Sequence, residues 1–119
     1  AGMAYLQLNK YKEAVTHLDK FSSSDPILSA LALGNIGDAF VALNQPNDAL
    51  DYYKKAIDKS DNALTAPIYL NKAAQVAQDQ KNYKEALTYL ERIKSDYPKS
   101  EEAASVDVQI SQVQALMNL

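Results

Sequence analysis

The chain lacks cysteine altogether, and it has one histidine, three glycines and four prolines among its 119 residues. Without cysteine, disulfides and thiolate metal sites are excluded, and the redox compartment leaves no mark on the sequence. The few glycines and prolines leave little room for loops, while abundant alanine, leucine, lysine and glutamine favour helix. No β-branched and aromatic residues alternate over a run long enough for a strand. The sequence therefore predicts an all-α fold.

Long apolar runs and a charge excess of one sign are also missing. No apolar run approaches the ~18 residues of a membrane span, so direct membrane insertion of this segment is not expected. No secretory signal is visible, although a chain that begins after one would look the same. The net charge is -3, and basic residues are interleaved with acids, as in KKAIDKSD, so no continuous cationic stripe forms. We therefore expect no nucleic-acid binding.

An internal repeat is present instead. The segment YKEAVTHL, residues 11–18, returns as YKEALTYL at residues 83–90, with six of eight positions identical. Between them PNDALDYY, residues 46–53, keeps the alanine and a large residue four places later. The three alanines, Ala14, Ala49 and Ala86, are 35 and 37 residues apart. A period in the mid-thirties is typical of stacked helical hairpins.

Turn and capping residues divide this repeat into helices. Ser and Asp in SSSDP, residues 22–26, predict a cap with Pro26 in the first turn, and Asp61-Asn62 predicts another. We expect seven helices, the first cut short, over residues 1–8, 11–22, 27–43, 47–59, 64–79, 83–95 and 100–117.

Aligning the units on their alanines reveals an ordered pattern. A small residue stands twelve places before each alanine, and further recurring positions follow it: Gly2, Gly37 and Ala74; Tyr5, Phe40 and Ala77; Tyr11, Pro46 and Tyr83; Leu18, Tyr53 and Leu90; Pro26, Asp61 and Pro98. The small residues let two helix axes approach to about 8–10 Å, and Tyr5, Phe40, Leu18, Tyr53 and Leu90 are expected to fill the space between hairpins.

This order resembles the tetratricopeptide repeat family over nearly the whole chain. The departures are Leu33 and Leu70 at the usual large position, Ala77 in place of an aromatic residue and Asp61 in place of proline. The resemblance implies helix-turn-helix repeats in a right-handed superhelical solenoid. Its units would span residues 1–28, 29–63 and 64–99, followed by a capping helix over 100–119.

The last helix carries one apolar stripe, made of Ala103, Val106, Ile110, Val113 and Met117. A capping helix of a solenoid needs such a stripe on one side and a polar face on the other. The alternative is contact with a partner helix or a second chain through Leu116, Met117 and Leu119.

Catalytic chemistry has little support in the sequence. His17 is the residue that would attract a search, but its equivalents in the other units are Tyr52 and Tyr89, which indicates a packing position. Gly34 and Gly37 lie inside a helical pattern and form no phosphate loop. We therefore expect no catalytic residue, no metal site and no cofactor.

The family resemblance implies a concave groove lined by the first helix of each hairpin, which would hold an extended peptide or a partner helix. The expected groove residues are Met3, Leu6, Gln7, Leu31, Asn35, Asp38, Val41, Ala42, Ile68, Asn71, Lys72, Gln75, Gln78 and Asp79. Asn71, Gln75 and Gln78 share one helical face, where amides can donate to and accept from a peptide backbone. Plain solvation of this face is the alternative.

Some family members bind a C-terminal carboxylate with a clamp of lysines, asparagines and an arginine. Asn35 and Lys72 fall at matching places, but Met3 and Ile68 stand where an asparagine and a lysine are required. We therefore expect no such clamp.

The leading functional hypothesis is a non-catalytic protein-interaction module. Structural self-association into a dimer or stack is the alternative, and a domain of an enzyme whose active site lies elsewhere is a third hypothesis. The segment KNYKEALTYLERIKSDYPKSEEA resembles bacterial cell-envelope repeat proteins, some of them membrane-tethered, chaperone-like adaptors. That resemblance implies a periplasmic location, with the cytoplasm as the alternative.

Overall fold

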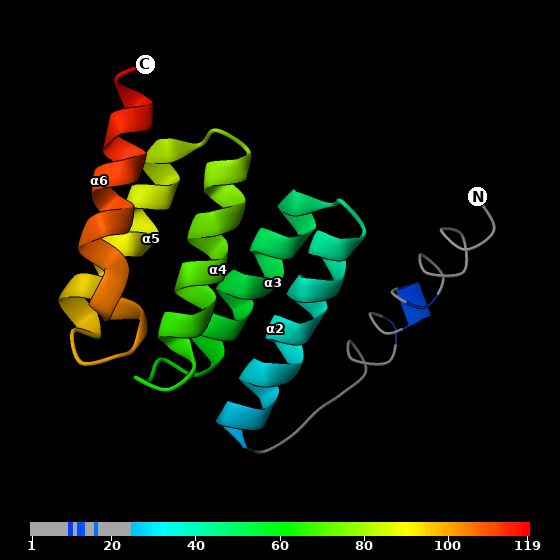
Figure 1. Ribbon diagram of the computed structural model, residues 1–119. Coiled ribbons are helices and arrows are strands. Elements are labelled where there is room, and N and C mark those ends of the chain that lie inside the picture. The colour runs from blue at the N-terminus through cyan, green and yellow to red at the C-terminus, as the bar shows by residue number, and fades with distance from the viewer. Residues whose placement is uncertain (1–9, 11, 14–15, 17–24) are drawn as a thin grey trace. The chain divides into compact units, whose positions relative to one another are not determined.

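The computed structural model describes residues 10, 12–13, 16 and 25–119, and these residues form α-helices and one short 3-10 helix, with no strand among them (Figure 1). The elements are α2 (Pro26–Ala42), α3 (Pro46–Lys59), α4 (Ala66–Asp79), α5 (Tyr83–Asp96), η1 (Glu102–Ser105) and α6 (Val106–Met117). The chain divides into two compact units, Ala1–Ser60 and Asp61–Leu119. The predicted all-α fold is confirmed.

In the first unit, α2 and α3 form an antiparallel hairpin (Figure 1). The carboxylate of Asp25 accepts a hydrogen bond from the backbone N–H of Ile27 at 2.9 Å, and Pro26 occupies the first turn of α2. Pro46 likewise occupies the first turn of α3. Both prolines stand where a helix leaves its N–H groups without an intrahelical partner, so they cost no hydrogen bond.

The core of this hairpin is a close contact between Gly37 of α2 and the ring of Tyr53 of α3. A Cβ added at Gly37 would lie 2.6 Å from Cε1 of Tyr53, which is closer than carbon atoms pack. The hydroxyl of Tyr53 donates to Oδ1 of Asp38 at 2.6 Å. Tyr53 therefore fills space inside its own hairpin. Its expected packing between hairpins stays a prediction.

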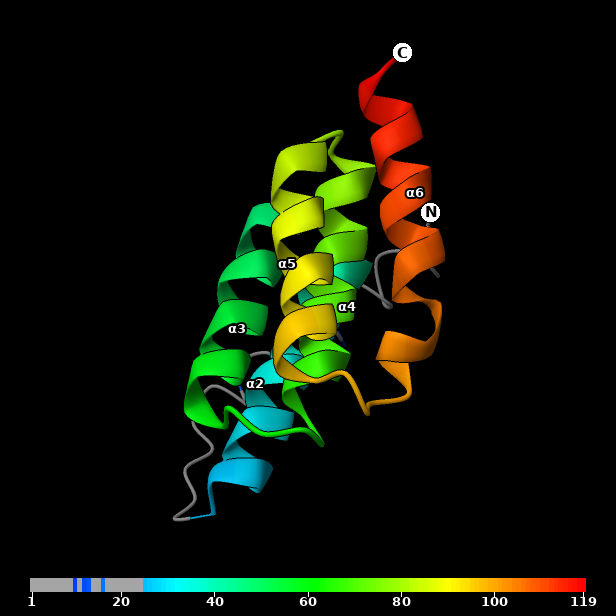
Figure 2. The same cartoon turned by 90° about the vertical axis from the view of Figure 1, so that its left-hand side faces the viewer.

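In the second unit, α4 and α5 form another antiparallel hairpin, and α6 packs against α5 (Figure 2). Asn62 prepares the start of α4, because its side-chain oxygen accepts from the backbone N–H groups of Leu64 at 2.8 Å and Thr65 at 2.9 Å. The fully buried side chains here come from all three helices: Leu70, Leu90, Ile93, Val106 and Val113. One apolar core therefore holds this unit together.

The small residues of the repeat lie where the sequence predicted them. Ala49 and Ala86 are 0% exposed, and Gly37 and Ala74 are buried as well. Small residues at these points let the paired helices approach closely. The prediction of buried small residues is confirmed for the second and third repeat units. Gly2 and Ala14, of the first repeat unit, lie outside the described residues.

The two hairpins turn in the same way. Asn44 and Lys81 follow α2 and α4 with positive φ values of 58° and 62°. The backbone N–H groups of Gln45 and Asn82 reach back to the carbonyls of Phe40 and Ala77. This 6→1 bond after a left-handed residue is the Schellman ending of a helix.

The last helix differs from its prediction at its start and in the exposure of one residue of its stripe, whereas its end at Met117 agrees with the predicted end. It begins not at residue 100 but with the 3-10 turn η1, in which Ala103 N–H binds the Ser100 hydroxyl oxygen at 3.2 Å. Met117, predicted on the buried stripe, is 46% exposed, while Val106 and Val113 are buried. The C-terminal turn of α6 extends past the N-terminal end of α5 (Figures 1 and 2).

The predicted helices over 27–43, 47–59, 64–79 and 83–95 agree with α2 to α5 within about two residues. The predicted helix over 1–8, with Tyr5, lies outside the described residues. Of the predicted helix over 11–22 the structure describes only residues 12, 13 and 16, so Leu18 lies outside as well. The division into repeat units at residues 28, 63 and 99 stays a prediction.

Candidate functional site

Helix α2 exposes several apolar side chains. Leu31 is 37% and Val41 47% exposed, and Asn35 and Ala42, which were also predicted for the groove, are exposed. Sequence reasoning missed Leu28, which is 50% exposed one turn before Leu31. Its spacing of three from Leu31 could have identified it. An exposed group of aliphatic side chains on one helix suits an apolar partner.

Asp38 belongs to the predicted groove, but its carboxylate is already engaged. Its Oδ1 accepts from the Tyr53 hydroxyl at 2.6 Å, and the side chain is half-buried. A carboxylate that accepts a phenolic hydrogen bond is held in one orientation. Asp38 is therefore a rigid part of the α2–α3 hairpin as well as a candidate contact.

The first helix of the second unit exposes Asn71, Gln75 and Gln78, which we call the α4 amide face. Gln75 is exposed, and Asn71 and Gln78 are half-buried. The Nε2 group of Gln75 donates to Oδ1 of Asp79, one turn further along, at 3.2 Å. The structure thus shows that these residues meet solvent on α4, as their spacing predicted.

Ile68 and Lys72 flank the α4 amide face and are half-buried. The ammonium of Lys72 lies 5.9 Å from the ring centroid of Tyr69, within cation–π distance. Because Tyr69 is only 3% exposed, the lysine stem lies along a buried ring rather than extending freely into solvent.

An unpredicted residue joins the α4 amide face from α6. The Nε2 group of Gln109 donates to Oδ1 of Asn71 at 3.1 Å, across 38 residues of sequence. The other polar atom of Gln109, Oε1, is buried and has no hydrogen-bond partner among the described residues. No sequence signal marks Gln109, because a polar residue beside an apolar stripe looks like any solvated position.

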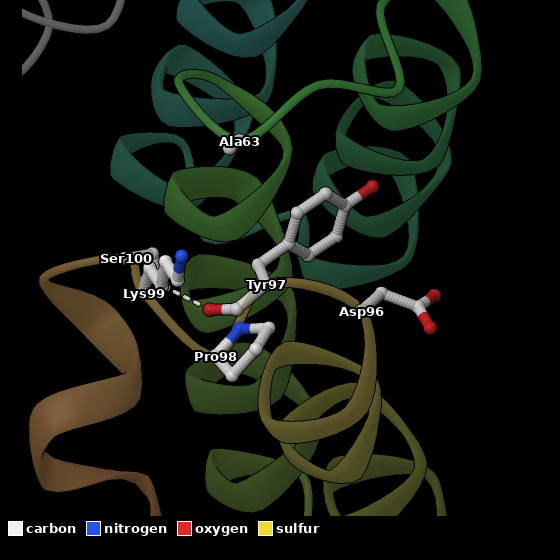
Figure 3. Close-up of a pocket in the computed structure, with 6 residues that line it drawn as sticks. All are labelled: Ala63, Asp96, Tyr97, Pro98, Lys99 and Ser100. Carbon is white, nitrogen blue, oxygen red and sulfur yellow. Dashed lines mark hydrogen bonds between the residues drawn. The ribbon is translucent and has the colours of Figure 1, made fainter.

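A pocket of about 250 Å³ lies in the second unit at the junction between α5 and η1. It is lined by Ala63, Asp96, Tyr97, Pro98, Lys99 and Ser100 (Figure 3). The Tyr97 carbonyl accepts from the Ser100 hydroxyl at 2.8 Å, so this backbone oxygen is already satisfied. None of the predicted site residues reaches this pocket, and its charged residues, Asp96 and Lys99, are exposed.

Among the residues that the structure describes, no group of three or more His, Cys, Asp or Glu residues could hold a metal ion. The pKa of Lys94 is raised, first by a hydrogen bond to Asp107 and then by the negative charge of Asp107. That pair, with an Nζ–Oδ1 distance of 2.8 Å, joins α5 to α6 on the surface.

The remaining predicted residues, Met3, Leu6 and Gln7 of the groove and His17, lie outside the described residues. For the described helices, none is both long and apolar enough to cross a membrane. Of the two residues that depart from the carboxylate clamp, Ile68 lies in the described part of the chain. Its aliphatic side chain, half-buried on α4, stands where the clamp requires a lysine.

Comparison with known proteins identifies a family and a relative. The sequence pattern of the family described as "Tetratricopeptide repeat" matches residues 1–63 and again residues 35–101. A Mus musculus protein, "Tetratricopeptide repeat protein 23-like", is 33% identical over 110 residues, which cover 76% of this chain and 24% of that protein. The chain therefore spans about a quarter of the length of this curated relative.

Proposed function

The chain belongs to the tetratricopeptide repeat family, and on this premise we propose that it binds a peptide or a partner helix on the first helices of its hairpins, above all on α4. Proteins of this family generally mediate protein–protein interaction and are generally non-catalytic scaffolds. The proposal for this chain is that the α4 amide face makes the contact.

The observation that carries the proposal is the chemistry of this face. A helix face that only meets solvent usually carries charges, as α5 does with Lys84 and Glu91, both exposed. The α4 amide face presents three uncharged amides at steps of four and three instead. Each amide can donate and accept, so together they suit the backbone of a partner and demand few particular side chains.

The test is affinity capture with the whole chain as bait. Changing Asn71, Gln75 and Gln78 to alanine together should abolish recovery of the partners that the unchanged chain captures. The matched control changes Lys84, Thr88 and Glu91 of α5 to alanine. These residues are exposed and have the same spacing of four and three. Changing His17 should also leave recovery intact.

If the α5 variant loses the partners and the α4 variant keeps them, the proposal is wrong about the binding face. Both variants should first be shown to keep the helical content and unfolding midpoint of the unchanged chain.

A second candidate function is structural self-association through α6. The exposed apolar residues of α6 and of the chain beyond it support it: Val108 is 62%, Met117 46% and Leu119 101% exposed. Beyond Asp107 the helix carries no charged residue, which lowers the cost of burying it. Sedimentation over a range of concentrations distinguishes the two functions, because a module that awaits a partner stays monomeric.

An adaptor or chaperone-like role, and a periplasmic location in a bacterial envelope, remain predictions from the sequence, and the mouse relative gives them no support.

A further inference from the structure

Resting on the proposed function of the α4 amide face, we propose that Gln109 is a positioning residue that fixes the amide of Asn71 so that Asn71 presents its N–H donor to the partner. The partner group at this point is then a hydrogen-bond acceptor, the backbone carbonyl of an extended segment. On this inference α6 belongs to the binding surface in addition to covering the core.

The contact between the two residues is fixed by the packing of α6. Val106 and Val113, on either side of Gln109 in the sequence, are 2% and 0% exposed. They hold the helix backbone in place, so the Gln109 stem reaches α4 from a fixed origin. The 3.1 Å bond from Gln109 Nε2 then occupies Oδ1 of Asn71.

The direction of this bond follows from the buried end of Gln109. Oxygen and nitrogen of an amide have nearly the same shape, so the reverse bond, from Asn71 Nδ2 to Gln109 Oε1, has to be compared. In the observed direction the buried atom without a partner in the described residues is the Gln109 carbonyl oxygen. In the reverse direction it would be an NH2 group. Buried orphan donors are rarer in proteins than under-satisfied carbonyls, so the observed direction is favoured.

Two neighbouring amides are therefore each oriented by one hydrogen bond. Asn71 accepts through its oxygen from Gln109, which leaves both N–H groups of its NH2 to donate, and Gln75 donates one N–H to Asp79, which leaves its oxygen to accept.

The donor of Asn71 and the acceptor of Gln75 favour an extended segment over a partner helix. The backbone N–H and C=O groups of a helix are used within the helix, and only its ends offer free ones. A donor and an acceptor one turn apart on α4 would find no partners along the side of a docked helix. An extended segment offers both kinds of group along its edge.

A direct test needs no partner. Nuclear magnetic resonance of the whole chain should show fast exchange of the Asn71 side-chain NH2 protons with water and slow exchange of those of Gln109. The opposite order of exchange would overturn the inference, because Asn71 would then be the donor.

The second test uses Gln109→Glu, which has the same shape but only accepts. Asn71 must then turn its NH2 group toward residue 109 and its oxygen toward the partner, and its NH2 exchange should slow. Gln112→Glu is the control, because Gln112 is exposed on the same helix and the change adds the same charge.

The probe is a displayed library of random twelve-residue peptides, selected on the unchanged chain. The selected peptides should bind Gln109→Glu at least tenfold more weakly, whereas Gln112→Glu should bind them within twofold. Asn71→Ala should cause a similar loss, and adding Gln109→Glu to it should cause no further loss, because the two changes remove one interaction.

The outcomes separate the two levels of the proposal. Peptides that are lost with Asn71→Ala but bind Gln109→Glu as well as Gln112→Glu would overturn the role of Gln109 and leave the proposed function standing. Peptides that ignore changes at Asn71, Gln75 and Gln78, or a library that yields no binder, would overturn the proposed function itself.

Discussion

At the scale of single residues, Gly37 and Tyr53 fit closely against each other. The third repeat unit has the larger Ala74 and the smaller Leu90 at the equivalent sequence positions, so the sizes of the two residues change in opposite directions. The pattern of small residues was visible in the sequence. The position of the Tyr53 ring against Gly37, and its bond to Asp38, were not, because periodicity gives the face of a residue but not the direction of its side chain.

Gly37→Ala is predicted to destabilise the chain. The new Cβ would lie 2.6 Å from Tyr53 Cε1 and 2.7 Å from Cδ1, so the ring has to move and its bond to Asp38 is strained. Such overpacking costs about 1–3 kcal/mol, from which the better helix propensity of alanine recovers about 1 kcal/mol. Urea unfolding should show a lower midpoint with an unchanged slope.

The companion variant combines Gly37→Ala with Tyr53→Leu and thereby copies the Ala74 and Leu90 pair. Removal of the clash should make the double variant more stable than additivity predicts. If the two changes are additive, the ring contact does not limit the approach of α2 and α3.

Lys81 is predicted to be a suboptimal turn residue. Its φ of 62° costs a residue with a Cβ about 1–2 kcal/mol, while glycine at the same place pays about 0.5–1 kcal/mol more unfolded-state entropy. Lys81→Gly should therefore stabilise the chain by roughly 0.5–1 kcal/mol, seen as a higher melting temperature. Lys81→Asn should give a smaller gain, because Asn44 already fills the equivalent position. A lower melting temperature for Lys81→Gly would contradict the left-handed turn.

At the scale of elements, the helix starts are held by side chains that the sequence identified. The Asp61-Asn62 pair was predicted as a cap, and in the structure the Asn62 side chain caps the turn that precedes α4, whose own N-cap residue is Thr65. Asn62→Ala should destabilise the chain by about 1 kcal/mol, because two backbone N–H groups lose their acceptor. Thermal unfolding measures the change.

The neighbouring variant Asp61→Ala is the control for this cap. Asp61 faces Arg92 at 3.6 Å, and both side chains are substantially exposed, so removing the pair should change stability by less than about 0.5 kcal/mol. Equal losses in the two variants would mean that charge near the helix start matters and that the cap does not.

The pair between Lys94 and Asp107 connects α5 with α6 and predicts a pH dependence. Its hydrogen bond and charge raise the pKa of Lys94. A raised folded-state pKa contributes stability below the ordinary lysine value of about 10.4, and the contribution is lost as pH rises through the folded pKa. Asp107→Asn should lower the pKa of Lys94, which a carbon-13 titration of its ε-carbon can follow. Added salt should reduce the difference, because both side chains are exposed.

The start of α6 and the role of Gln109 mark the limit of what the sequence could predict. The Ser100 hydroxyl competes with the α-helical pattern and holds a 3-10 turn, and only local geometry decides between the two. Gln109 lies beside the apolar stripe of α6, where a polar residue is expected to meet solvent. Its contact with Asn71 depends on where α6 packs. Helix positions and small core residues were predictable because they repeat. Contacts between side chains of different helices occur once and were not.

At the scale of the whole molecule, each compact unit has a core of its own. Ile36, Ala49, Ala56 and Ile57 are buried in the first, and Leu70, Leu90, Ile93, Val106 and Val113 in the second. The repeat period was sufficient to predict the hairpins, since each is built by a local pattern. The superhelical path implied by the family resemblance stays a prediction.

Because repeat proteins gain much of their stability from local packing, a defect in one unit should act mainly within that unit. Gly37→Ala is therefore predicted to speed amide hydrogen exchange in α2 and α3 far more than in α4, α5 and α6. The matched defect in the second unit is Leu90→Ala, which removes a side chain only 2% exposed from its core and should speed exchange in α4 to α6 instead. Mass spectrometry of peptides from both variants, under conditions where the folded state dominates, makes the comparison. Exchange that rises equally in all helices for both variants would show that the chain opens as one cooperative unit, and would contradict the division at Ser60 and Asp61.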